Sequence, residues 1–118
     1  MRILFIIRKP PFGWIHIVEA LRLAAAGGSL AIPVTLLFID DGIYCPMKNQ
    51  FPKVIGYSAI DRFLRMLQNF ESKLYVVRES MEERGLTMED LNPALNIESV
   101  ALSDVAKIVA QHDIATTF

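Results

Sequence analysis

Short, continuous apolar runs are the feature of this sequence that most limits its fold. Residues 3–8 and 34–39 read ILFIIR and VTLLFI, and residues 74–77 form a shorter run, LYVV. Each run has the length of a strand and lacks polar alternation, so both faces of each strand should be covered. The more polar segment 113–118, DIATTF, predicts a last strand at an edge of the sheet, and residues 97–102 fit either a strand or a loop that enters a helix.

Amphipathic helices are predicted between these runs. Residues 14–26 and 58–70 both place apolar side chains on one stripe at helical spacing. The stripes are Trp14, Ile17, Val18, Leu21, Ala24 and Ala25 in the first segment, and Ile60, Phe63, Leu64, Leu67 and Phe70 in the second. Gly27 and Gly28 are expected to end the first helix.

Two shorter helices complete the predicted pattern. A polar helix over 78–85 should close at Gly85, and Ser103 should cap a helix over 104–110. Strands that alternate with helices in this way indicate βαβ units. We therefore expect a single α/β domain over 1–118, a three-layer α/β/α sandwich on a mainly parallel sheet of about five strands.

Composition argues against several classes of function and setting. The chain has 12 Lys+Arg against 13 Asp+Glu and a formal charge of −1, so it lacks the positive surface that direct nucleic-acid binding requires. No run approaches the roughly 20 apolar residues that span a bilayer, and no cleavage site of small residues follows the first run, so neither membrane contact nor a signal peptide is expected. A single cysteine cannot form an internal disulfide, which fits a reducing, cytoplasmic setting.

The chain is nevertheless very apolar for its size. Its 118 residues are 53% hydrophobic, and the mean hydropathy is +0.35. A small domain has much surface per unit volume, so part of this apolar content must lie outside. We expect a homo-oligomer or a hetero-oligomer, with helix 14–26 or helix 58–70 at an interface.

Candidate site residues lie at the ends of the first and second apolar runs, because open α/β sheets place their sites at the carboxyl ends of strands. The predicted mouth of the site comprises Arg8, Asp40, Asp41, Gly42 and Tyr44. Adjacent residues on an extended chain point to opposite sides, so Asp40 and Asp41 are not expected to share a substrate or a metal ion. The favoured interpretation is a turn at the end of the strand, in which Gly42 supplies an unusual φ.

Motifs for nucleotides and metals are not found. Residues 8–13 read RKPPFG before the first helix, but the two prolines lack the N–H groups that bind phosphate, and no glycine-rich phosphate loop is present. His16 and His112 are far apart, and neither lies in a cluster with the spacing of metal ligands. We therefore expect neither a metal nor a cofactor.

Cys45 is the only cysteine, and two interpretations of it remain open. A lone cysteine is most often an inert buried residue. Cys45 also lies just past a strand end, in the irregular segment 43–57, where a partly exposed thiol could have its pKa lowered by backbone N–H groups. It is therefore the one catalytic candidate.

Several stretches of the sequence together resemble the DsrE/DsrF-like sulfur-relay family, and within it the DsrF/TusC subunit type. They are ILFIIRKPPFG with EALRLA, VTLLFIDDGIYC, ERGL and the final HDIATTF. The resemblance implies a small α/β/α sandwich in a system that transfers sulfane sulfur as cysteine persulfide, for 2-thiolation of tRNA or for sulfur oxidation. It also implies assembly with related DsrE/TusD-type and DsrH/TusB-type subunits.

The resemblance does not extend to the persulfide cysteine. In the DsrE/TusD type this cysteine follows the third strand, and counting back from the glycine that ends the next helix reaches Val77 in this chain. We therefore expect an accessory subunit of a cytoplasmic sulfur-relay assembly. The alternatives are a sulfurtransferase that carries persulfide on Cys45 and a small oligomeric α/β domain that binds a ligand at segment 43–57.

Overall fold

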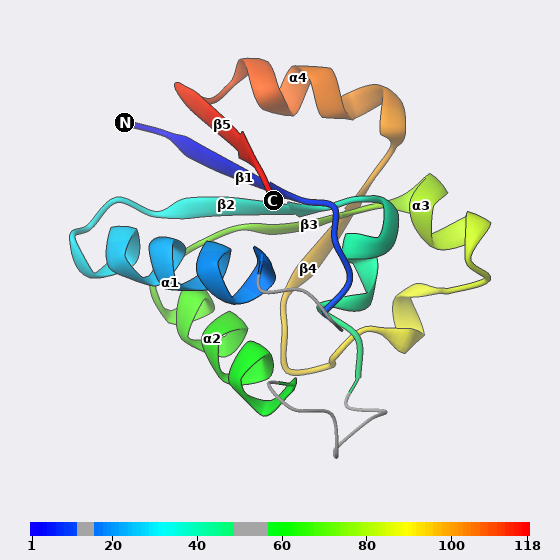
Figure 1. The fold of residues 1–118 in the computed structure, drawn as a ribbon. Helices are drawn as coiled ribbons and strands as arrows, with labels where there is room; N and C mark the ends of the chain where they lie inside the picture. Colours follow the sequence, from blue (N-terminus) through cyan, green and yellow to red (C-terminus); the bar gives the residue numbers. More distant parts are fainter. Residues whose placement is uncertain (12–15, 49–56) are drawn as a thin grey trace.

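Five parallel strands form the centre of the molecule in a computed structural model that describes residues 1–11, 16–48 and 57–118 (Figure 1). The strands are β1 Ile3–Ile7, β2 Val34–Phe38, β3 Leu74–Val77, β4 Ile97–Val100 and β5 Ile114–Thr117. Their order across the sheet is β4-β3-β2-β1-β5, so β4 and β5 are the two edge strands. All pairings among these five strands are parallel, which sends the carboxyl ends of the strands to one edge of the sheet.

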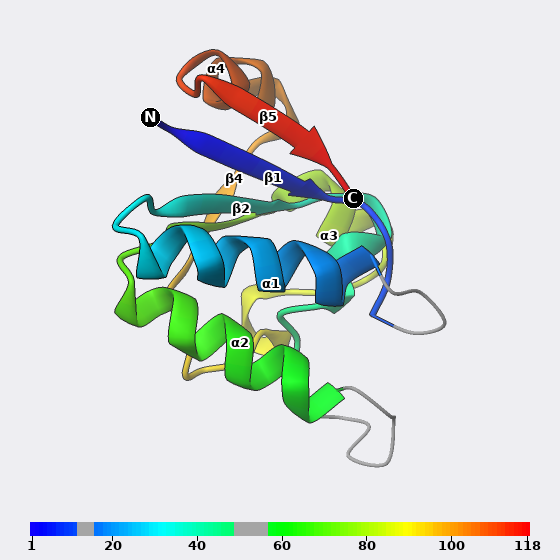
Figure 2. The ribbon, with the colours of Figure 1, turned by 60° about the vertical axis from the view of Figure 1, so that its left-hand side comes forward.

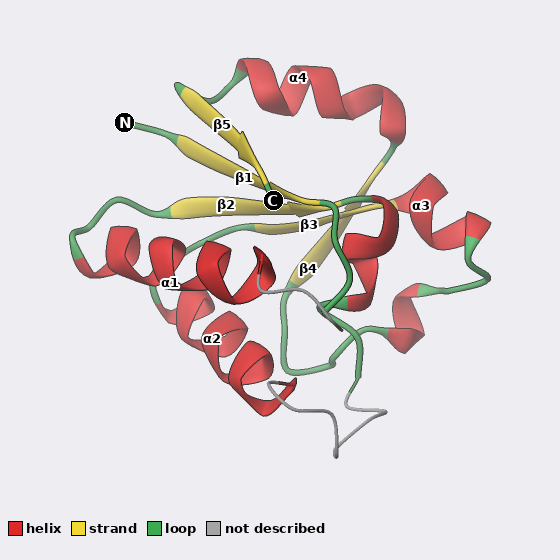
Figure 3. Cartoon of the chain, viewed as in Figure 1, coloured by secondary structure: helices red, strands yellow, loops and turns green. Residues whose placement is uncertain are grey.

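Helices lie on both faces of this sheet, as Figures 2 and 3 show. Helices α1 (His16–Ser29) and α2 (Tyr57–Asn69) pack side by side on one face, and α4 (Val105–Ala110) lies on the other. The short helix α3 (Arg78–Glu83) follows β3 directly at the carboxyl edge. The predicted three-layer α/β/α sandwich is therefore confirmed. No helix in the described parts of the chain is long and apolar enough to cross a membrane.

Two apolar clusters fill the spaces between the layers, because successive residues of a strand point to opposite faces. The larger lies under α1 and α2 and takes Phe5 and Ile7 from β1. The smaller lies under α4, where Leu4, Leu37 and Val77 meet Ile108. Continuous apolar strands were predicted to be covered on both faces, and this burial explains why they are not alternating.

The predicted elements correspond closely to the observed ones. The runs at 3–8, 34–39 and 74–77 became β1, β2 and β3, and segment 113–118 became the edge strand β5. The ambiguous segment 97–102 forms β4 and then leads into a short 3-10 helix, Leu102–Asp104. Trp14 of the first predicted stripe lies outside the described residues.

The expectation that Gly27 and Gly28 end the first helix is wrong, because α1 continues through both to Ser29. A Cβ on Gly28 would lie 2.4 Å from the ring of Phe70 in α2, and a Cβ on Gly27 would lie 2.9 Å from the Ile32 carbonyl oxygen. These glycines therefore allow close approach to neighbouring elements and do not terminate the helix.

The actual end of α1 is a left-handed residue, Ala31, with φ 60°. The Ile32 N–H donates to the Gly27 carbonyl at 2.7 Å, and the Ala31 N–H donates to the Gly28 carbonyl at 3.1 Å. This pair of bonds is the Schellman motif, which usually has glycine at the left-handed position. Helix α2 ends in the same way, with Glu71 at φ 62°.

Ser103 is not the cap of α4, as the sequence predicted. It lies inside the preceding 3-10 turn, and the Asp104 carboxylate accepts the Ala101 N–H at 3.3 Å. The prediction was wrong because the chain makes one tight turn before the α-helix begins. The closure of α3 by Gly85, at φ 68°, is confirmed.

Candidate functional site

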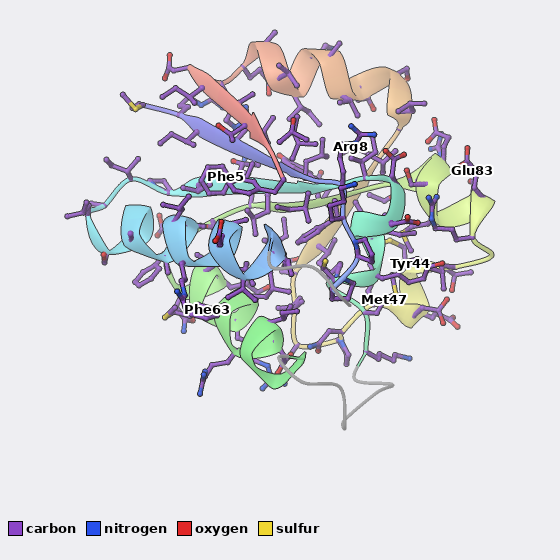
Figure 4. All side chains as sticks on the ribbon, viewed as in Figure 1. Phe5, Arg8, Tyr44, Met47, Phe63 and Glu83 are labelled. Carbon is purple, nitrogen blue, oxygen red and sulfur yellow. The ribbon has the colours of Figure 1, made fainter. Side chains whose placement is uncertain are left out.

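The carboxyl edge of the sheet brings most of the predicted site residues together. Arg8 follows β1, and residues Asp40–Tyr44 form a 3-10 helix, η1, one residue after β2. Helix α3 follows β3 at the same edge and contacts η1. Figure 4 labels Arg8 and Tyr44 on this side of the molecule. The parallel topology explains this convergence, because it places the segments after β1, β2 and β3 side by side.

Gly42 lies against the end of β1, and its role differs from the predicted one. A Cβ at this position would lie 1.9 Å from the carbonyl oxygen of Ile7, so only glycine fits without moving the backbone. The unusual φ of the turn belongs to Asp40, at 53°, and not to Gly42. Aspartate tolerates this left-handed conformation better than most residues. The turn at the end of the strand was predicted correctly, but its left-handed residue is Asp40 and not Gly42.

Asp40 and Asp41 each face a different arginine. Asp40 pairs with Arg8 at 3.2 Å, and both side chains are about half exposed. Asp41 pairs with Arg84 at 3.0 Å. The two carboxylates therefore pair with separate cations.

The Arg84 pair is the better shielded of the two. The Arg84 side chain is 21% exposed, against 58% for Arg8, and it also donates to the Ser80 carbonyl oxygen at 3.0 Å. Ser80 is buried, and its hydroxyl accepts the Asp40 N–H at 3.0 Å. Together these bonds fasten α3 to η1.

The sequence did not identify Ser80 and Arg84 as part of this edge. Both lie on the short helix that the sequence predicted as simply polar. The only available indication was the ERGL stretch at its end, which contains Arg84. No sequence pattern shows that a serine hydroxyl will meet a backbone N–H some 40 residues away.

Cys45 is buried directly behind η1, with 2% of its surface exposed. Its thiol lies 3.7 Å from the backbone carbonyl oxygen of Lys9, to which it donates a weak hydrogen bond. A carbonyl oxygen only accepts, so this contact favours the protonated thiol. Burial raises the pKa of the Cys45 thiol far above its usual range. The thiolate, which is the nucleophilic form, is therefore strongly disfavoured near neutral pH.

Val77 occupies the junction of β3 and α3. It is completely buried and contributes its hydrocarbon side chain to the apolar cluster under α4. The junction itself is a strand end that leads into a helix N-terminus, which is the kind of position where a cysteine thiolate is stabilised. Here the position provides packing and no reactive atom.

Tyr44 is half-buried and packs against the larger apolar cluster, and Met47 lies buried close to it in the chain. Met47 forms an isolated antiparallel bridge with Leu91, which links this segment to the loop before β4. Residues 49–56 of the predicted ligand-binding segment lie outside the described residues. Of the predicted ligand-binding segment 43–57, only residues 43–48 and 57 are described, and the ligand-binding alternative stays a prediction.

The described residues contain no group of three or more His, Cys, Asp or Glu side chains that could hold a metal ion. His112 lies near the opposite, amino edge of the sheet. Its Nδ1 lies 2.7 Å from the carbonyl oxygen of Ile108, and its Nε2 lies 3.1 Å from the Thr35 hydroxyl. Because a carbonyl only accepts, Nδ1 donates, and His112 tethers α4 to β2. The side chain of His16 lies outside the described residues.

Comparison with known proteins gives this arrangement a family. The model of the DsrE/DsrF-like family matches residues 1–118. The chain belongs to the DsrE/DsrF-like family. The resemblance stated from the sequence motifs is thereby confirmed.

Individual relatives agree with the family match. The chain is 37% identical over 91 residues to the intracellular sulfur oxidation protein DsrF of Allochromatium vinosum, covering 76% of this chain and 67% of that protein. It is 35% identical over 105 residues to a TusC homolog of Pseudomonas aeruginosa, covering 87% of this chain and 88% of that protein. Both names correspond to the subunit type that the sequence resembles.

Solved structures support the fold. The crystal structure of the ychN protein from E. coli superposes with a TM-score of 0.81 at 22% identity and covers the whole of both chains. A protein of unknown function from Methanobacterium thermoautotrophicum, MTH1491, gives a TM-score of 0.69 at 12% identity, over 99% of this chain and 98% of that one. At these identities the comparison supports the α/β architecture alone.

Proposed function

We propose that this chain is an accessory subunit of a sulfur-relay assembly, and that it supports sulfur transfer without carrying persulfide itself. The first part is supported by family membership and by relatives named DsrF and TusC homolog. The A. vinosum relative is named for intracellular sulfur oxidation, which favours that pathway. The alternative pathway is 2-thiolation of tRNA, and for both we propose a cytoplasmic setting. Related DsrE/TusD-type and DsrH/TusB-type subunits are the proposed partners.

The burial of Cys45 is the observation that carries the second part of the proposal. Persulfide transfer needs a thiolate that attacks the outer sulfur of a donor persulfide, forms a new S–S bond and releases the donor thiolate. The chain has one cysteine, and that thiol is 2% exposed and hydrogen-bonded to a carbonyl oxygen. It therefore lacks both the access and the ionisation that the attack requires.

Val77 gives a second, independent argument for the same conclusion. A valine at the junction of β3 and α3 cannot form a persulfide, and its side chain is fully buried in the apolar cluster. In this proposal a partner subunit supplies the working cysteine. The carboxyl edge of the present chain, with its two arginine–aspartate pairs, supports that partner structurally.

The competing function is sulfur carriage on Cys45. Intact-mass spectrometry after incubation with a cysteine desulfurase and cysteine distinguishes the two. We expect no donor-dependent gain of about 32 Da, the mass of one sulfur atom, on the native chain. Cys45→Ala is the matched control, because it removes the only sulfur acceptor of this kind.

Activity of the complete assembly provides the second measurement. Reconstituted with its co-purified partners, the folded Cys45→Ala chain should support sulfur transfer at close to the native rate. A donor-dependent adduct that disappears in Cys45→Ala, together with loss of transfer by a correctly assembled complex, would show that Cys45 is a carrier. Failure of the chain to co-purify with any sulfur-relay subunit would reject the assembly itself.

A further inference from the structure

Strand β5 is attached to the molecule along one edge only. It lies outside β1 at the end of the sheet (Figure 1). Each of its four residues is exposed. The apolar residue Ile114 has 44% of its surface exposed. An uncharged strand that is open to water on both faces and along one edge is a surface that natural proteins usually protect.

The backbone of β5 alternates between its bonded and its open side. The N–H groups of Ile114 and Phe118 donate to the carbonyl oxygens of Arg2 and Ile6, at 3.3 and 2.8 Å, so these residues bond towards β1. Neighbouring residues of a strand direct their polar groups to opposite sides. The N–H and C=O groups of Ala115 and Thr117 therefore point to the open edge.

The two edges of the sheet differ in their protection. Strand β4 carries the exposed, charged Glu98 in its middle, and charge on an edge strand opposes pairing with another strand. Strand β5 reads IATT and contains no charge and no proline. Its open edge is therefore compatible with pairing, whereas the edge at β4 is not.

We propose that β5 pairs antiparallel with β5 of a second copy of this chain, across a two-fold axis at Thr116. In this register Ala115 lies opposite the partner's Thr117, and each pair exchanges two backbone hydrogen bonds. The symmetric pair does the same on the other side of the axis. A register centred on Ala115 would satisfy only one such pair, because Asp113, which would lie opposite the partner's Thr117, already donates its N–H to the Arg2 carbonyl oxygen.

The side chains of this register are complementary as well. Ile114 and Thr116 lie on the α1 face, since they are in register with Ile3 and Phe5 of β1. Ile114 then meets the partner's Phe118, a pairing of a β-branched with an aromatic side chain, which is favourable across strands. Phe118 is already held in place by Phe5, with the ring centroids 4.9 Å apart.

A second copy fits this edge better than an open chain of copies. An antiparallel pair about a two-fold axis closes on itself, whereas parallel addition at one edge continues without limit. The joined sheet also points the carboxyl edges of the two copies in opposite directions. Both candidate sites therefore stay accessible to other subunits. The inference does not depend on sulfur relay and can fail independently of it.

Charge exchange at Thr116 tests the position of the axis. In a two-fold pair Thr116 faces the partner's Thr116, so Thr116→Lys and Thr116→Glu each place like charges in direct opposition. Each variant alone should weaken the dimer about tenfold or more, and an equimolar mixture of the two should restore it. Sedimentation of the purified full-length chain over a micromolar concentration series measures the effect. Ser99→Lys on β4 is the matched control and should leave the dimer unchanged.

A crosslinking variant gives an independent result. Residues opposite each other in a pair without backbone hydrogen bonds have Cα atoms about 4.5 Å apart, which suits a disulfide. Thr116→Cys should therefore form a covalent dimer on mild oxidation, while Ser99→Cys and the native chain should not, because Cys45 is buried. A native chain that stays monomeric, dimers that survive both charged variants, or a mixture that fails to associate would each overturn the proposed pairing.

Discussion

At the scale of single residues, Gly42 lies so close to the end of β1 that any larger residue would have to displace backbone. Its missing Cβ would lie 1.9 Å from the Ile7 carbonyl oxygen, whereas a Cβ on Gly85 would meet nothing within 4 Å. We expect Gly42→Ala to cost about 3 kcal/mol of unfolding free energy or more, because η1 or β1 must shift. Gly85→Ala should cost only about 1 kcal/mol, for its left-handed φ. Urea denaturation of the two variants measures this difference, and equal costs would contradict the close approach.

The buried thiol of Cys45 should make stability depend on alkaline pH. In the unfolded chain a cysteine ionises near pH 8.5, but burial raises the pKa of Cys45 in the folded chain. Above about pH 8.5 the unfolded state therefore binds fewer protons than the folded state, and stability falls as pH rises. This one group contributes at most about 1.4 kcal/mol per pH unit.

Cys45→Ala provides the control for that pH dependence. The variant should lose roughly 1 kcal/mol near neutral pH, because a small cavity replaces the sulfur atom. Between pH 8.5 and 10 the native chain should lose stability faster than the variant, and the two curves should converge. Parallel curves in denaturant titrations at each pH would mean that the thiol ionises freely in the folded state.

At the scale of elements, two helices end on residues that are poorly suited to their conformation. Ala31 and Glu71 both adopt the left-handed region that glycine occupies without a steric cost. We expect Ala31→Gly and Glu71→Gly each to raise the unfolding free energy by roughly 0.5–1 kcal/mol. Ala26→Gly, at an exposed interior position of α1, should lower it by a similar amount. The opposite signs are measured by thermal or urea denaturation, and a loss of stability at Ala31 would refute the assignment of its role.

The glycines of α1 and η1 show which features of the elements could be predicted from the sequence. Continuous apolar runs and helical stripes predicted β1, β2, β3, α1 and α2, because periodicity depends on burial alone. Gly27 and Gly28 were misinterpreted as a stop because the sequence does not show Phe70 packed against them. Gly42 was correctly placed in a turn, but its reason is contact with β1, which is distant in the sequence. Local patterns thus predicted the elements, while tertiary contacts decided the role of each glycine.

At the scale of the whole molecule, strand order decides what the sequence could not show. The apolar excess predicted association, with α1 or α2 as the interface. The exposed side chain of Leu23 on α1 is compatible with that location, which stays a prediction. The open side of β5 follows from the order β4-β3-β2-β1-β5, which no local pattern specifies. The candidate site at the carboxyl edge could be anticipated more fully, because any parallel sheet brings the segments after β1 and β2, with Arg8 and η1, to one edge. The bonds by which Ser80 and Arg84 attach α3 to η1 could not be anticipated from the sequence.

Charge balance gives the last prediction, which concerns tRNA. The formal charge of the chain is −1, and Arg8, Arg65 and Arg84 each pair with an aspartate at 3.2 Å or less. Binding to a polyanion requires unpaired cations that displace condensed counterions, and its affinity then falls steeply with salt. We therefore expect the isolated chain to show no specific, salt-sensitive binding of tRNA in a filter or gel-shift assay at micromolar concentration. The assembly with its partner subunits is the comparison, because any link to tRNA should run through them. Sub-micromolar, salt-sensitive binding by the isolated chain would contradict this division of roles.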